Sequence, residues 1–195
     1  MTAETAGTGG TVETAGTVET AEVGGTVETA EAGNGGHATY EKLIALLDER
    51  GAAYRVLEHA PEGATEAVSA LRGNTLAQAA KCIIAMVKIG KKEKRFALAV
   101  VPGDRRIDLA AVKALYGGTY VSFASPEIAE ELAGSPSGTI LPFAFDERLE
   151  LIVDPDLLGH AELYFNAARL DRSLALSTED YRAIAEPRVE RVSTV

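Results

Sequence analysis

Hydrophobic and polar residues alternate with the periods typical of helices and strands only from about residue 39 onward. Apolar residues between Leu43 and Leu47 follow helical spacing, which predicts a helix that ends near Gly51. The run Tyr54–Leu57 is typical of a strand, and a second helix is predicted between Thr65, as its cap, and Gly73.

Two β-rich runs come next, Lys81–Val87 and Arg95–Val101. They are separated by a short polar segment, so the pattern predicts an antiparallel hairpin. Further short strands are expected at 149–153, 163–165 and 173–176.

The later helices are marked by residues that cap helix N-termini. Asp108 precedes a helix that runs to Tyr116, Ser125 precedes one that ends at Gly134, and Ser177 begins the last one. Helices and strands thus interleave, without the regular alternation of a doubly wound fold.

The first 36 residues have a different composition. The motif Thr-Val-Glu-Thr-Ala occurs three times, and the segment holds six glutamates but no Lys, Arg or aromatic residue. Such a segment cannot bury enough apolar area to offset its chain entropy. We therefore predict a disordered acidic tail at 1–36 and one folded domain at 37–195. An interaction tail or a solubilising spacer is the alternative, although nothing in the segment specifies a partner.

Charge and cysteine content exclude several classes of protein. The net charge is −10, and six of these charges lie in the tail, which leaves −4 for the rest. This balance argues against nonspecific coating of DNA but permits weak, salt-dependent contact with a nucleic-acid end. The single cysteine, Cys82, excludes an internal disulfide, and no apolar run is long enough for a membrane span. We expect a cytoplasmic protein with no membrane partner.

Lys81 leads into the first strand of the predicted hairpin. A lysine whose stem lies along apolar surface can present its ammonium to a cleft, where it holds a phosphate or polarises a carbonyl. The plain alternative is that Lys81 only marks the point where a core strand reaches solvent. Three downstream segments favour the first interpretation: Val101–Asp108, Gly138–Phe143 and Phe165–Asp171.

In their order and spacing, Lys81 and these segments resemble the YbaK and prolyl-tRNA synthetase-associated editing-domain family, from Tyr40 to Pro187. The resemblance implies a mixed α/β (α+β) single domain with a curved mixed sheet flanked by helices. It also implies a free-standing deacylase that hydrolyses the ester between tRNA and a small, wrong amino acid: Ala, Ser, Thr or Cys. The partner is then a mischarged aminoacyl-tRNA, and we expect transient contact with a synthetase.

The same resemblance implies roles for a catalytic loop. Lys81 holds substrate oxygens, and Gly138 begins a Gly-x-x-x-Pro loop whose backbone N–H groups face the ester carbonyl and its developing oxyanion. We expect Thr139, Ile140 and Pro142 of this loop to contact substrate. A plain turn that enters a strand is the alternative.

Two more residues are candidates for the substrate pocket. The amide of Asn166 is expected to bond the amino acid or the terminal ribose, or else to cap the turn that leads to Leu170. His59 is expected either in the pocket or on the surface. The family usually has glycine where this chain has Ala168, which leaves the width of the pocket open.

Basic residues of the hairpin connection, Lys88, Lys91 and Lys92, are expected to contact tRNA phosphates together with Arg105. A solvated hairpin tip is the alternative. Glu66 is interpreted first as an acid that favours the start of its helix, and second as a ligand for a substrate amino group.

Other catalytic schemes do not fit the sequence. Pro136 stands where a nucleophile elbow needs serine, and the three histidines have no metal-ligand spacing, so we expect no metal and no cofactor. In the implied mechanism, water attacks the ester with no covalent enzyme intermediate. A non-catalytic module that binds an amino acid or aminoacyl ester, and a hydrolase for a non-RNA ester, stay open as alternatives.

Overall fold

The computed structural model describes residues 34–195, so most of the predicted acidic tail lies outside the described residues. The last three residues of that tail belong to helix α1 (Asn34–Glu49), which begins earlier than the sequence predicts. Gly36 explains why the helix can begin there. A Cβ at this position would lie 2.5 Å from the carbonyl oxygen of Ala168, so only glycine permits the close approach.

The described residues form five α-helices and two short 3-10 helices. The α-helices after α1 are α2 (Thr65–Arg72), α3 (Leu109–Leu115), α4 (Pro126–Ala133) and α5 (Thr178–Ala185), and the 3-10 helices are η2 (Leu76–Gln78) and η3 (Leu157–Gly159). The three predicted caps are confirmed. The side chains of Asp108, Ser125 and Ser177 each accept a hydrogen bond from the backbone N–H group three residues later in the chain.

The cap predicted for α2 is wrong. Ala64 is the N-cap and makes no side-chain cap bond, while Thr65 is already helical. The carboxylate of Glu62 instead accepts hydrogen bonds from the N–H groups of Gly63 (2.8 Å) and Ala64 (2.7 Å). The start of α2 is therefore organised by an acid that precedes it.

The strands form three sheets. A five-stranded mixed sheet has the order β5-β2-β3-β6-β9, with antiparallel β2–β3 and β2–β5 pairs and parallel β3–β6 and β6–β9 pairs; an antiparallel sheet has the order β1-β8-β7, and β10 pairs with β4. The bounds are β1 (Tyr54–Glu58), β2 (Ala80–Ile89), β3 (Glu93–Pro102), β4 (Arg106–Ile107), β5 (Tyr120–Phe123), β6 (Leu149–Val153), β7 (Glu162–Asn166), β8 (Arg172–Ser177), β9 (Arg188–Val189) and β10 (Ser193–Thr194).

The central sheet is buried on both faces, because alternate residues of β3 enter different clusters. Leu98 and Val100 pack with Leu43 of α1, whereas Ala97, Ala99 and Val101 pack on the opposite side with Val112 of α3. This arrangement explains why β3 reads as a continuous apolar run rather than as an alternating one.

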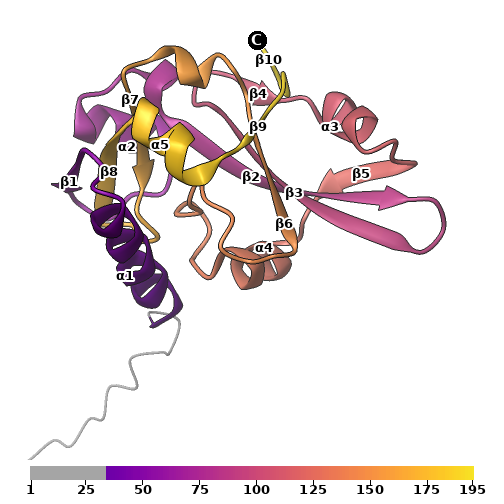
Figure 1. Ribbon diagram of the computed structural model, residues 1–195, viewed down its shortest axis with the longest axis horizontal. Helices are drawn as coiled ribbons and strands as arrows, with labels where there is room; N and C mark the ends of the chain where they lie inside the picture. The colour runs from indigo at the N-terminus through magenta and orange to yellow at the C-terminus, as the bar shows by residue number, and fades with distance from the viewer. Residues whose placement is uncertain (1–33) are drawn as a thin grey trace, which may run out of the picture. The chain divides into compact units, whose positions relative to one another are not determined.

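The predicted β2–β3 hairpin is confirmed, and Figure 1 shows its tip extending away from α1, α2 and α5. The predicted fold class, a mixed α/β domain, is also confirmed. Lys81 lies near the start of β2, at the end opposite to the hairpin tip. Among residues 34–195, no helix is both long and apolar enough to cross a membrane.

Candidate functional site

Lys81 is half-buried, and strand pairing of β2 with β3 places it opposite Val101. Its Nζ donates hydrogen bonds to the carbonyl oxygens of Gly103 (3.2 Å) and Arg105. A lysine ammonium carries three N–H groups. Two are used on this turn, so one N–H remains for a ligand.

Burial lowers the pKa of Lys81. The carboxylates of Asp104 and Glu66 oppose this shift, and the guanidinium of Arg106 adds to it. Cys82 follows Lys81 in the strand and packs on the opposite side against the α1 cluster, where burial raises the pKa of its thiol. In this part of β2, Lys81 therefore places its ammonium on the side of the strand opposite to the α1 cluster.

Gly138 adopts a left-handed backbone conformation with φ of 84°. A Cβ there would lie 3.0 to 3.3 Å from backbone atoms of Gly63, so both the conformation and the packing require glycine. The loop is anchored on both sides. The N–H and hydroxyl of Thr139 donate to the carbonyl oxygen of Pro136 (3.0 and 2.7 Å), and the carbonyl oxygen of Pro142 accepts from Tyr181 (2.8 Å).

Three main-chain N–H groups of this loop are open. Within residues 34–195, those of Gly138, Ile140 and Leu141 donate no hydrogen bond. Gly138 is exposed and Ile140 half-buried, whereas Thr139, Leu141 and Pro142 are buried. Fixed backbone donors with no protein acceptor are what an oxyanion site requires.

The amide of Asn166 is occupied by protein partners. Its Nδ2 donates to the carbonyl oxygens of Glu62 (2.8 Å) and Gly138 (3.0 Å), and its Oδ1 accepts from Ser173 (2.9 Å). The cap of its own turn, which the sequence offered as an alternative, does not form. Contact between this amide and substrate would require one of these bonds to break, so Asn166 joins two loops in this structure.

His59 is half-buried and belongs to the same network. Its Nε2 lies 2.7 Å from the hydroxyl of Ser173, and its Nδ1 lies 2.8 Å from the carbonyl oxygen of Ala60. Arg72 also reaches the Ser173 hydroxyl, at 3.3 Å. The sequence did not indicate Ser173 or Arg72, because a serine that opens an apolar strand and an arginine at a helix end carry no chemical motif.

The segment Gly63–Glu66 links the two halves of the site. Gly63 packs against Gly138 on one side, and Thr65 packs against Gly103 on the other, where a Cβ of Gly103 would lie 2.8 Å from the Thr65 methyl group. Glu66 acts electrostatically on Lys81. We call this arrangement, with Lys81, the 103–105 turn and the 138–142 loop, the candidate site.

Residues 59–184 match the family described as the aminoacyl-tRNA editing domain. The chain belongs to this family.

Curated relatives agree with this assignment. The chain is 42% identical over 153 residues to "Multifunctional Ser/Thr-tRNA deacylase ProXp-y" of Escherichia coli (strain K12), a match that covers 78% of this chain and 91% of the relative. It is 25% identical over 150 residues to "Prolyl-tRNA editing protein ProX" of Acetoanaerobium sticklandii, with 75% and 90% covered.

A solved structure, that of the hypothetical protein APE2540, superposes with a TM-score of 0.71 at 26% identity and covers 78% of this chain and 99% of its own. A candidate trans-editing enzyme for prolyl-tRNA synthetase superposes with a TM-score of 0.67 at 23% identity, covering 80% and 98%, and supports the fold. Together, the comparisons confirm the predicted family and the predicted class of enzyme, an aminoacyl-tRNA deacylase.

Ala168 of this editing domain occupies a left-handed conformation with φ of 59° and is buried. Glycine adopts this conformation without strain, which gives a physical reason for the family's usual glycine. The Ala168 carbonyl oxygen packs on Gly36 of α1. The start of α1 thus packs closely on the backbone of Ala168.

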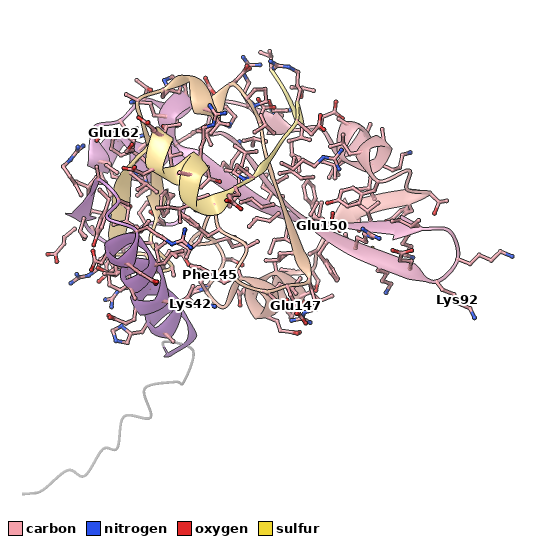
Figure 2. The ribbon with its side chains drawn as sticks, in the orientation of Figure 1. Lys42, Lys92, Phe145, Glu147, Glu150 and Glu162 are labelled. Atoms are coloured by element: carbon pink, nitrogen blue, oxygen red, sulfur yellow. The ribbon has the colours of Figure 1, made fainter. Side chains whose placement is uncertain are left out.

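The lysines predicted to bind tRNA lie apart from the candidate site. The Lys88 ammonium lies 5.2 Å from the ring centre of Tyr120, and Figure 2 shows Lys92 at the free end of the hairpin. Nine strand residues at about 3.3 Å each place that tip roughly 30 Å from Lys81. Arg105 is close to Lys81 but forms an ion pair with Asp156 (3.2 Å).

No group of three or more His, Cys, Asp or Glu side chains in the described part of the editing domain is arranged to hold a metal ion. The candidate site itself presents an ammonium, a nearby carboxylate and open backbone N–H groups.

Proposed function

We propose that this editing domain acts in trans to hydrolyse the ester that links serine or threonine to a wrongly charged tRNA. The observation that carries the proposal is the candidate site itself. One open N–H of Lys81 and the open N–H groups of the 138–142 loop flank the same segment, Gly63–Glu66. The name of the E. coli relative, a Ser/Thr-tRNA deacylase, supports the choice of acyl group.

In the proposed reaction, a water oxygen adds to the ester carbonyl carbon. The carbonyl oxygen becomes an oxyanion, which the N–H groups of Gly138 and Ile140 stabilise more strongly than they bind the neutral carbonyl. The bond between the carbonyl carbon and the ribose oxygen then breaks, and the ribose oxygen takes up the proton that the attacking water gives up. Lys81 holds substrate oxygens throughout this sequence.

A covalent route through the chain's one cysteine is disfavoured. Burial raises the pKa of the Cys82 thiol, so little thiolate forms near neutral pH, and the side chain faces the core. Water, oriented by substrate groups such as the neighbouring ribose hydroxyl, is the nucleophile in this proposal.

Recognition of the tRNA body belongs to the proposal as well. Lys88, Lys91 and Lys92 are exposed on the hairpin and are available for phosphates, whereas Arg105 must exchange its ion pair with Asp156 to take part. We place this activity in the cytoplasm, with transient contact between the editing domain and a synthetase that releases the mischarged product.

Deacylation of a panel of purified tRNAs tests the proposal. The panel carries Ser, Thr, Ala or Cys on noncognate tRNA, with correctly charged tRNA as the control. We expect fastest turnover for Ser or Thr. Saturable binding of these tRNAs without release of amino acid would instead favour the binding module, and hydrolysis of simple esters alone would favour a non-RNA hydrolase.

A further inference from the structure

We infer that Ser173 is a positioning residue for the editing reaction, and that it acts through Asn166 on the 138–142 loop. This inference rests on the proposed function, because it assumes that the backbone donors of this loop stabilise the oxyanion. Ser173 lies at the start of β8 and is fully buried, and its hydroxyl bonds His59, Arg72 and Asn166 rather than Lys81 or the loop. Its effect must therefore pass through hydrogen bonds.

The orientation of the Asn166 amide follows from its partners. Two carbonyl oxygens, of Glu62 and Gly138, face one end of the amide, so that end must be Nδ2. The other end must be Oδ1, which needs a donor, and the hydroxyl of Ser173 supplies it at 2.9 Å. Without that proton, Oδ1 of Asn166 loses the hydrogen bond that holds this end of the amide.

This orientation matters for the loop because Asn166 holds the Gly138 carbonyl. The peptide group that contains this carbonyl lies between the open N–H groups of Gly138 and Ile140, and its own N–H, that of Thr139, donates to Pro136. Asn166 ties this part of the loop to Glu62, so loss of the tie would let the loop shift and displace both open donors. A buried hydroxyl two contacts away thus helps to hold these donors in place.

Two further groups face the Ser173 oxygen. The single hydroxyl proton goes to Asn166, so Arg72 and His59 Nε2 both donate to this oxygen. His59 Nδ1 lies 2.8 Å from the carbonyl oxygen of Ala60. His59 Nε2 and Arg72 thus both hold the Ser173 oxygen, so its one proton is directed to Asn166.

The test uses the full chain and the best mischarged tRNA from the panel. We expect Ser173→Ala to lower kcat about 10-fold with KM changed less than about 2-fold, because a positioning fault acts on the transition state. Ser193→Ala is the matched control: Ser193 is a buried serine of β10 whose hydroxyl has no partner within the described residues, and its loss should leave kcat unchanged.

His59→Gln provides a second measurement that does not depend on a buried substitution. Glutamine keeps a donor toward Ser173, whereas alanine at this position removes it. We therefore expect His59→Ala to lower kcat several-fold with little change in KM, and His59→Gln to retain more of the wild-type kcat. Wild-type kcat for a folded His59→Ala, or for a folded Ser173→Ala, would overturn the inference. If the wild type hydrolyses no panel member, the proposed function fails instead.

Discussion

Gly138 combines two constraints that an ordinary turn glycine does not have. Its φ of 84° disfavours side chains, and Gly63 occupies the space that a Cβ would take. Gly117 has the first constraint alone, with φ of 59° and open space around the Cβ position. The two glycines therefore separate backbone strain from the packing of the candidate site.

We expect Gly117→Ala to lower stability by about 1 to 2 kcal/mol, the cost of a left-handed alanine, and Gly138→Ala to lower it by at least as much. Gly138→Ala should also lower kcat/KM at least about 10-fold, because the loop must move away from Gly63. Thermal melts and steady-state deacylation measure the two effects. Equal activity of both variants would show that loop geometry is not critical.

Residue-level features of the site were predictable only where a motif marks them. Lys81 and Gly138 stand in recognisable sequence contexts, and the structure places both beside Gly63–Glu66. Ser173 and Arg72 gave no signal, because the fold brings them together with each other and with His59 from about one hundred positions apart. Their hydrogen bonds depend on the pairing of β8 with β1 and β7, which periodicity does not reveal.

At the scale of elements, helix starts with a local chemical marker were predictable. Asp108, Ser125 and Ser177 cap their helices as expected. Strands of two to four residues, such as β4, β5, β9 and β10, were missed because partners from distant segments stabilise them. The sequence did not predict the parallel pairing of β3 with β6 either, because these two strands are distant in the sequence.

The exposed hairpin tip carries a prediction at this scale. If Lys91, Lys92 and Lys94 contact tRNA phosphates, replacing all three with Ala should raise KM, flatten its dependence on salt and spare kcat. Lys42→Ala on α1 is the control, since Lys42 lies over Phe145, away from the tip (Figure 2). Identical kinetics of the triple variant across a salt series would identify the tip as merely solvated.

For the whole molecule, two N-terminal deletions test where the tail ends and the folded domain begins. Composition predicts that residues 1–33 add no stability, so their deletion should leave the melting temperature and deacylation rate nearly unchanged. Deletion of residues 1–40 should lower the melting temperature by several degrees, because it removes Gly36 and the first turns of α1. A similar loss from the shorter deletion would contradict this division of the chain.

The central claim is that a half-buried ammonium and open backbone donors act together on an aminoacyl ester. A charge-assisted hydrogen bond in such a site contributes about 2 to 4 kcal/mol to the transition state. That range corresponds to roughly 30- to 1,000-fold in kcat/KM. Lys81→Arg should restore activity only in part, because a planar guanidinium cannot replace a compact ammonium that also bonds Gly103 and Arg105.

The most direct measurement is steady-state deacylation of the best mischarged tRNA by the wild type, Lys81→Ala and Lys113→Ala, with thermal melts of each. Lys113 lies in the last turn of α3 and serves as the matched control. We predict the full loss for Lys81→Ala and wild-type kinetics for Lys113→Ala. A folded Lys81→Ala that edits at close to the wild-type rate would contradict the account.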